Sequence, residues 1–248
     1  KAVSLISKIH NRFSVEMFLR DIFSAPTVRE MAKLMGNLDK SLYTNIQPVE
    51  EKEYYSLSSA QRRMYIINKM EGATTNYNNP GVNVITGELD KVRLEEVFKA
   101  LIQRHEAFRT SFKMVDGEPV QIIHKESDFE IEHIIAEESD VDRVIKEFIR
   151  PFDLERAPLL RVGLVELSDQ KHILICDMHH IISDGVSANI LVNEFIQLLN
   201  GKSLPKLLLN YKDYSEWQDK LIKSGSMSKQ EEYWLNTFSG RIPELTMP

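Results

Sequence analysis

The stretch MHHIISDGVSA, residues 178–188, contains the side chains best suited to chemistry. His179 and His180 close an apolar run, and Asp184 and Gly185 follow shortly after. An imidazole takes up and releases protons near neutral pH, with an ordinary pKa of about 6.5. A nearby carboxylate can orient an imidazole, hold a loop or help to bind a metal. The stretch is therefore compatible with an acid–base site, a metal site or a packed strand end.

The two histidines are expected to face opposite ways, because residues 171–180, KHILICDMHH, are typical of a strand. Side chains alternate between the faces of a strand, so His180 shares a face with Cys176 and His179 shares the other with Asp177. A metal needs converging ligands, which argues against a metal here. Ligands of α/β sheets bind where strands end. We therefore expect the acid–base role at His180 and a packing or hydrogen-bonding role at His179.

Helices and strands alternate around this stretch. Apolar spacing and capping residues predict helices over residues 58–70, 90–106, 141–152, 186–201, 211–225 and 228–240. Strands are predicted over residues 82–89, 159–167 and 171–180, and a hairpin over 108–124 turns at Asp116-Gly117. Residues 74–81, TTNYNNPG, have the composition of a loop. This interleaving predicts an α/β (α+β) mixed-layer structure.

The first 38 residues are predicted to be helical throughout. Thr27 and Glu30 fit a capping box before the segment VREMAKLM. Such short helices cannot bury a full core of their own. Residues 39–52 are polar and non-periodic, with Pro48 as a stiffener, and are expected to form a linker. We therefore expect domain boundaries at 1–38, 39–52 and 53–248, and a chain that begins within a helix is expected to be a piece of something longer.

The composition is that of an ordinary globular protein. The 248 residues are 42% hydrophobic and 27% charged, with a formal net charge of -6. This lack of basic excess argues against a nucleic-acid partner. The apolar runs are far shorter than the roughly 20 residues of a membrane helix. A single cysteine, Cys176, excludes an internal disulfide and favours a reducing, cytoplasmic location.

Several stretches together resemble one family. HHIISDG at 179–185 matches HHxxxDG, the signature of condensation domains of nonribosomal peptide synthetases, which are related to chloramphenicol acetyltransferase. LSSAQRRMY at 57–65, RHEAFRTSF at 104–112 and YKDYSEW at 211–217 resemble further motifs of that family. Phe108 stands where the family usually has Leu. The resemblance covers residues 51–240.

The resemblance implies a fold and its neighbours. Residues 53–248 would form the N-terminal lobe of a condensation domain, a chloramphenicol acetyltransferase-like sandwich. Residues 1–38 resemble the C-terminal helices of a peptidyl carrier domain. In that family the serine that bears 4'-phosphopantetheine lies in a GGxS motif, which would stand just before Lys1. No residue of this chain is then expected to bind that cofactor, and the isolated fragment is expected to be inactive.

The resemblance also implies a reaction and roles. The α-amine of an acceptor aminoacyl thioester would attack a donor thioester, both carried on pantetheine arms, and His180 would act as a general base or position the amine. Asp184 would pair with an arginine, first Arg109 and otherwise Arg104, while His179 supports the motif. Gly185 would allow either close backbone approach or a plain turn.

Two other functions remain open at this point. An epimerisation domain shares the HHxxxDG stretch, and a catalytically silent docking platform would need no chemistry. The expected partners are upstream and downstream carrier domains, an adenylation domain and the second lobe, within a monomeric module. No nucleic acid, membrane or metal is expected. MHHIISDGVS also favours a donor residue of L configuration.

Overall fold

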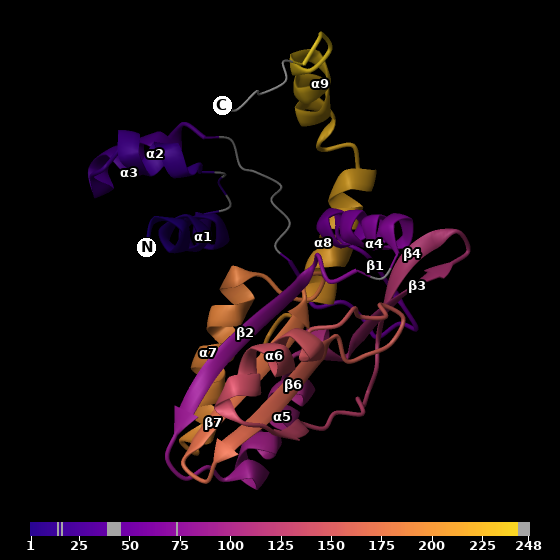
Figure 1. Cartoon of the computed structure of the whole chain (residues 1–248). Coiled ribbons are helices and arrows are strands. Elements are labelled where there is room, and N and C mark those ends of the chain that lie inside the picture. Colours follow the sequence, from indigo (N-terminus) through magenta and orange to yellow (C-terminus); the bar gives the residue numbers. More distant parts are fainter. Residues whose placement is uncertain (14, 16, 39–45, 73, 243–248) are drawn as a thin grey trace. The chain divides into compact units, whose positions relative to one another are not determined.

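A computed structural model describes residues 1–13, 15, 17–38, 46–72 and 74–242 of the chain (Figure 1). The chain forms two compact units, residues 1–47 and 48–248. Much of the predicted linker, residues 39–45, lies outside the described residues. Each unit is described by itself below.

The first unit contains three helices, α1 (Ala2–Phe13), α2 (Leu19–Ser24) and α3 (Val28–Gly36). The predicted capping box is present, because Thr27 Oγ1 accepts a hydrogen bond from the Glu30 N–H at 3.3 Å and the Glu30 side chain accepts from the Thr27 N–H. Its core is small and centres on Ile9, Val15 and Met17. The helical prediction for this segment is confirmed.

The second unit is built on a sheet of four strands in the order β2-β7-β6-β5. These strands are β2 (Asn78–Thr86), β5 (Glu132–Ile135), β6 (Leu160–Ser168) and β7 (Lys171–His179). β5 and β6 run parallel, and the other pairs are antiparallel. A smaller antiparallel sheet has the order β1-β4-β3, from β1 (Tyr55–Ser56), β3 (Thr110–Val115) and β4 (Glu118–Ile123).

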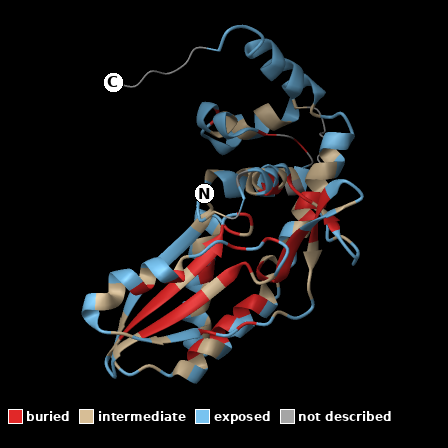
Figure 2. Ribbon diagram, turned by 45° about the vertical axis from the view of Figure 1, so that its right-hand side comes forward, coloured by how far each residue is buried: buried red, intermediate tan, exposed pale blue. Residues whose placement is uncertain are grey.

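Helices cover both faces of the four-stranded sheet. On one face, α5 (Lys91–Arg104) and α7 (Gly185–Leu199) contribute Leu94, Phe98 and Leu191 to a core with strand residues such as Leu174. On the other face, α6 (Val141–Phe148) packs on strand residues such as Ile175. Figure 2 shows buried central strands, β6 and β7, beside a mostly exposed edge strand, β2. The alternating apolar strand residues therefore have helices to bury them on each side.

A glycine on β6 allows α6 to approach closely. A Cβ at Gly163 would lie 2.6 Å from Phe148 Cε2, well inside van der Waals contact. Phe148 itself is buried. Any larger residue at position 163 would therefore push α6 away from the sheet.

The remaining helices are α4 (Ser59–Glu71), α8 (Tyr211–Lys223) and α9 (Ser228–Thr237). Ser58 caps α4, since its side chain accepts a hydrogen bond from the Gln61 N–H. The hairpin turn is also as predicted, because Asp116 and Gly117 both have positive φ, the signature of a type I′ turn. Among the described residues, no helix is long and apolar enough to cross a bilayer.

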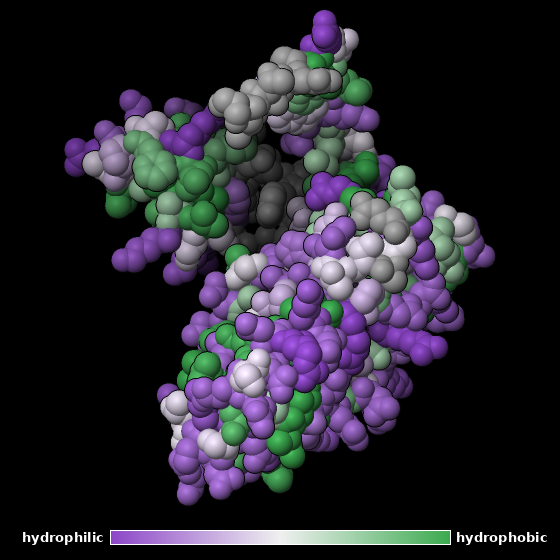
Figure 3. All heavy atoms as spheres, in the orientation of Figure 1, coloured by the Kyte–Doolittle hydropathy of each residue, from purple (hydrophilic) through white to green (hydrophobic). Residues whose placement is uncertain are grey.

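The loop predicted over residues 74–81 is wrong in its second half. β2 begins at Asn78 and includes Asn79, Pro80 and Gly81, paired with β7. Turn-forming residues are tolerated because β2 is an edge strand, where a proline need not donate a hydrogen bond inward. Figure 3 shows a largely hydrophilic surface with apolar side chains gathered over α7, where Val192 and Ile196 are exposed.

Candidate functional site

Four separated segments of the second unit meet around a cavity of about 520 Å³. The lining comes from α4, the segment after α5, residues 180–190 and residues 207–212, with two residues of β4. Each of these segments carries part of a motif singled out in the sequence. The polar residues that line the cavity include Gln61, His105, His180 and Tyr211. The motifs are therefore brought together in space, and the cavity is the candidate site.

His180 lines the cavity in a defined orientation. Its Nδ1 lies 2.6 Å from the backbone oxygen of Ser183. A carbonyl only accepts hydrogen bonds, so Nδ1 must carry the proton in the neutral ring. The other nitrogen, Nε2, then has a free lone pair, and no described residue forms a hydrogen bond with it. The side chain can accept a proton from a group in the cavity.

The backbone around His180 is held by a strand and a loop. The His180 N–H donates to the Tyr77 oxygen at 2.8 Å, just before β2 begins. The hydroxyl of Ser183 donates to the His179 oxygen at 3.1 Å, which closes the turn after β7. Ser183, to which the sequence assigned no role, thus fixes both the turn and the tautomer of His180.

His179 faces the interior of the unit. It is 1% exposed and lies near the rings of Tyr77 and Phe152. Its Nδ1 accepts a hydrogen bond from the Ile181 N–H at 3.0 Å. Burial, together with the neighbouring His180, lowers the pKa of His179 to about 4. The ring is therefore neutral at pH 7 and is placed for packing.

The predicted pairing of Asp184 with an arginine is wrong. Asp184 is exposed and caps α7, where its carboxylate accepts hydrogen bonds from the Ser187 N–H and hydroxyl, each at 2.7 Å. These hydrogen bonds lower the pKa of Asp184 below its usual value. A carboxylate at a helix N-terminus gains from the helix dipole and needs no cation.

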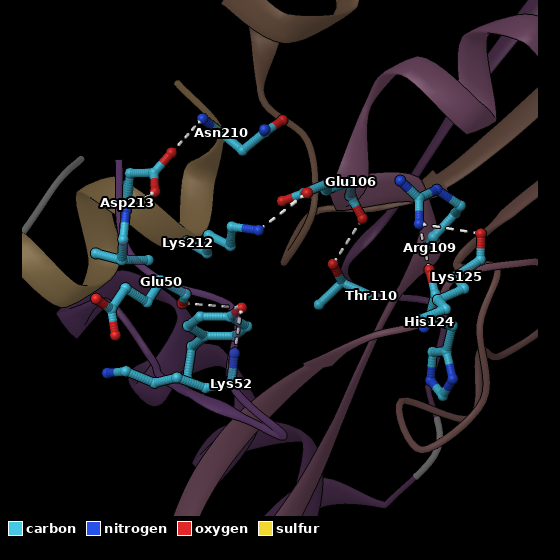
Figure 4. Close-up of polar contacts among 12 residues, drawn as sticks. Glu50, Lys52, Glu106, Arg109, Thr110, His124, Lys125, Asn210, Lys212 and Asp213 are labelled. Atoms are coloured by element: carbon cyan, nitrogen blue, oxygen red, sulfur yellow. Dashed lines mark hydrogen bonds and ion pairs between the residues drawn. The ribbon is translucent and has the colours of Figure 1, made fainter. Parts of the chain in front are cut away.

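Arg109 is buried and bonds to backbone oxygens instead (Figure 4). Its guanidinium donates to the oxygens of Ile102 and Gln103, at the end of α5, and to those of His124 and Lys125, after β4. The carbonyls at a helix C-terminus lack partners within the helix. Arg109 therefore joins α5 to the small sheet.

Arg104 pairs with a different carboxylate. Its Nε and Nη2 donate to the two oxygens of Glu194 on α7, at 2.9 and 3.1 Å. His105 Nε2 lies 2.6 Å from the same carboxylate. Burial acts to raise the pKa of Glu194, but the bonds from Arg104 and His105 leave it below its usual value. This cluster connects α5 to α7 beside the cavity.

Gly185 does not serve a tight turn. It is the first residue of α7, its φ is not positive, and a Cβ built there would meet open space. The turn-geometry explanation for this glycine is therefore wrong. Close backbone approach, the other explanation for Gly185, stays a prediction.

Further polar residues that the sequence did not single out line the cavity, among them Gln61, Glu106 and Lys212. Gln61 is buried, and its amide donates to the Ile181 oxygen at 3.5 Å. Glu106 and Lys212 form an ion pair at 3.0 Å between the segment after α5 and the start of α8 (Figure 4). All three stand within the quoted motif stretches, so their motif membership was the available signal.

Other nucleophiles and metal sites find little support. Burial raises the pKa of the Cys176 thiol to about 12, so a reactive thiolate does not form there near neutral pH. In the described ranges, no group of three or more His, Cys, Asp and Glu side chains could hold a metal ion. In the described part of the motif, both His179 and His180 have one ring nitrogen without a partner, but the His179 ring is buried and only the His180 ring lines the cavity.

Comparison with known families gives one match over most of the chain. The family model described as "Condensation domain" matches residues 51–248. This span includes the cavity and every segment that lines it.

Relatives and solved structures agree with that match. The chain is 47% identical over 248 residues to gramicidin S synthase 2 of Brevibacillus brevis, covering 100% of this chain and 6% of that protein. It is 46% identical to bacitracin synthase 3 of Bacillus licheniformis, over 100% of this chain and 4% of that protein. The chain therefore spans a small part of the length of these relatives.

The fold is similar to a domain from teicoplanin biosynthesis. The X-domain solved in complex with OxyB has a TM-score of 0.76 and 24% identity, with 83% of this chain and 48% of that chain covered. The first condensation domain of the calcium-dependent antibiotic synthetase has a TM-score of 0.66 and 20% identity, with 78% and 49% covered. The predicted layered fold is confirmed.

Proposed function

Because this chain belongs to the condensation-domain family of nonribosomal peptide synthetases, we propose that its cavity takes part in forming a peptide bond. The donor is a peptidyl or aminoacyl thioester, and the acceptor is the α-amine of an aminoacyl thioester. The observation that carries the proposal is the orientation of His180, whose Nδ1 is engaged by the Ser183 oxygen while Nε2 is free.

The proposed step moves one proton and one acyl group. The acceptor nitrogen attacks the donor carbonyl carbon, the carbon–nitrogen bond forms and the carbon–sulfur bond breaks. The proton leaving the nitrogen is taken up by His180 Nε2 and passes to the departing thiolate. A thioester is already activated, so a contribution of about 10²–10⁴-fold from a positioned base is sufficient.

His179 and Asp184 have supporting roles in this proposal. The neutral, buried ring of His179 holds the turn through the Ile181 N–H. Asp184 starts α7, so that the turn between the strand and the helix keeps one conformation. Neither residue exchanges a proton with the substrate.

Both substrates would arrive on 4'-phosphopantetheine arms of carrier domains. The cavity lining suits such an arm, because Met64, Ile190 and Leu209 offer apolar surface and Gln61 and Asn210 offer amide groups. The arm supplies the thioester bond that the reaction consumes. The chain's own residues orient the amine and move its proton.

The proposal includes the neighbours of the cavity. Residues 1–38 are the final helices of a carrier domain, residues 39–52 a linker, and residues 53–248 the first lobe of the condensation domain. A second lobe, an adenylation domain and flanking carrier domains complete a monomeric module in the cytoplasm. Relatives much longer than this chain support such an arrangement.

The test replaces the imidazole in the full-length synthetase. With donor and acceptor loaded on their carrier domains, His180→Val should slow single-turnover peptide formation by about 10²–10⁴-fold. His133→Val, at an exposed position on β5, is the matched control and should keep the wild-type rate.

Two outcomes would contradict the proposal. Peptide formation at the wild-type rate in His180→Val would favour a docking platform without chemistry. Exchange of the donor α-proton with deuterium from solvent, without peptide formation, would instead indicate an epimerisation domain.

A further inference from the structure

Two aliphatic residues of α7 line the cavity and keep accessible surface there. Val186 and Ile190 lie four residues apart, so they share one side of the helix. They are 68% and 46% exposed. Leu207, in the segment before α8, is half-buried and lines the same cavity. These three residues, called the aliphatic subsite below, therefore offer apolar surface that a bound molecule can reach.

The aliphatic subsite begins close to His180. The Ser183 oxygen, 2.6 Å from His180 Nδ1, belongs to a residue three positions before Val186, and this stretch of chain spans at most about 11 Å. Hydrogen bonds from Ser187 lower the pKa of Asp184, and the Val186 N–H and the His180 ring contribute further. The start of α7 and the imidazole thus lie on the same side of the cavity. An amino acid whose thioester lies at His180 can direct its side chain to Val186.

The cavity wall offers no free cation beside this surface. Lys212 is the only lysine or arginine in the described lining, and it lies 3.0 Å from the Glu106 carboxylate. The Asp184 carboxylate accepts hydrogen bonds from the Ser187 N–H and hydroxyl. An acidic side chain would therefore lose its hydration without gaining a partner. A basic side chain would have to compete with Ser187 and with the dipole of α7 for Asp184.

We propose that Val186, Ile190 and Leu207 bind the aliphatic side chain of an amino-acid substrate. The assignment rests on the proposed function, in which an aminoacyl thioester must reach His180. An aliphatic side chain gains free energy in proportion to the apolar area that leaves water. A charged side chain of the same shape gains nothing from this surface. Ile190, one turn further along α7, would contact both the side chain and the arm that carries it.

The first test compares two probes of nearly the same shape. Leucyl pantetheine amide and aspartyl pantetheine amide share the arm and the α-amine, and they differ at the end of the side chain. Calorimetry with the full-length synthetase should show that the leucyl probe binds about 10- to 50-fold more tightly, as expected when two or three carbon groups leave water. Equal binding of the two probes by the wild type would overturn the assignment.

A charged variant should change the selectivity in both directions. Val186→Lys should weaken binding of the leucyl probe by about 3- to 10-fold and strengthen binding of the aspartyl probe by about 2- to 5-fold. The gain for the aspartyl probe cannot come from misfolding. Val192→Lys is the matched control, because Val192 is exposed on the same helix and lies outside the described cavity lining. It should bind both probes as the wild type does.

A second variant keeps the charge and the shape of the side chain. Val186→Thr replaces a methyl group by a hydroxyl and should weaken binding of the leucyl probe by about 2- to 5-fold, with little change for the aspartyl probe. Because Val186 is exposed, neither variant disturbs the core. Affinities in Val186→Lys identical to those in Val192→Lys would overturn the assignment and indicate that the second lobe covers this surface.

Steady-state kinetics identify which substrate uses the aliphatic subsite. With leucine loaded first on the donor carrier and then on the acceptor carrier, Val186→Lys should raise KM for one of the two by about 3- to 10-fold, with kcat nearly unchanged. The carrier whose KM rises is the one whose amino acid contacts α7. A leucyl preference in a synthetase that forms no peptide would overturn the proposed function and leave the aliphatic subsite standing.

Discussion

Two adjacent histidines, the last residue of β7 and the first residue of the turn after it, lie in opposite surroundings. His179 is enclosed and neutral, with its Nδ1 bonded to a backbone N–H, while the neighbouring His180 is exposed at the cavity with a free Nε2. The difference shows that adjacency in the sequence does not imply a shared role. β7 ends at His179, and the turn that begins at His180 leaves that imidazole at the cavity.

The same contrast holds for the charged residues around the cavity. On the supporting side, each nitrogen of the Arg109 guanidinium bonds to a backbone oxygen. On the cavity side, Glu106 keeps one oxygen without a partner. An open valence does not by itself mark a binding residue, because the buried Nε2 of His179 also has no partner among the described residues. Substitutions on the two sides should have different consequences.

The largest effect on stability is expected at Arg109. Arg109→Met keeps the volume of the side chain but leaves carbonyls of α5 and of the segment after β4 without donors. We expect a loss of about 3–4 kcal/mol in the free energy of unfolding, measured by urea denaturation. Arg63→Met, at an exposed position of α4, should stay within about 0.5 kcal/mol of wild type. A loss of unfolding free energy as small as that of Arg63→Met would show that the hydrogen bonds of Arg109 do not stabilise the fold.

A somewhat smaller effect is expected from the titration of His179. The pKa is about 6.5 for an unfolded histidine and about 4 in the folded protein, so the unfolded chain binds the proton more tightly. The stabilisation from the neutral ring is therefore complete above pH 6.5 and is lost as the pH falls toward 4, by at most about 3 kcal/mol.

Urea denaturation across this pH range would measure the effect. His179→Gln should show a shallower loss of stability between pH 6.5 and 4 than the wild type. His133→Gln, at an exposed position of β5, should keep the wild-type dependence of stability on pH. Identical slopes in all three proteins would show that His179 is accessible to protons in the folded state.

The smallest effect is expected at Asp184. Asp184→Ala removes the cap of α7 and should cost about 1 kcal/mol, whereas Asp184→Asn keeps a capping side chain and should cost only a few tenths. Thermal or urea unfolding of both variants would measure the difference. If Asp184→Asn instead cost roughly 3–5 kcal/mol, the carboxylate would have a buried cationic partner after all.

Much of the fold could be predicted because local signals agreed with one another. Ser58, Asp90 and Thr27 cap helices where the sequence placed them, and Asp116-Gly117 forms the hairpin turn. The start of β2 at Asn78 could not be predicted, because its residues favour turns and the pairing with β7 overrides that preference. Local composition therefore failed where a long-range partner determined the structure.

The site was predicted less completely than the fold. The opposite placement of His179 and His180 was predicted from strand alternation, although β7 ends at His179 and His180 lies in the turn that follows. The partners of Asp184, Arg104 and Arg109 could not be predicted, because they depend on how α5, α7 and the small sheet approach one another. A sequence motif identifies residues that lie near a site, but it does not show which of them contact one another.

The pairing of β2 with β7 has a consequence for how freely the sequence can change. The His180 N–H is held by the Tyr77 backbone oxygen, at the end of a ladder that runs from Asn78 opposite His179 to Thr86 opposite Lys171. These are main-chain bonds, so substitutions of the exposed side chains of β2 leave the imidazole where it is. An insertion or deletion within the ladder would shift its register and move the histidine along with it. For this protein the length of β2 is under tighter constraint than its composition.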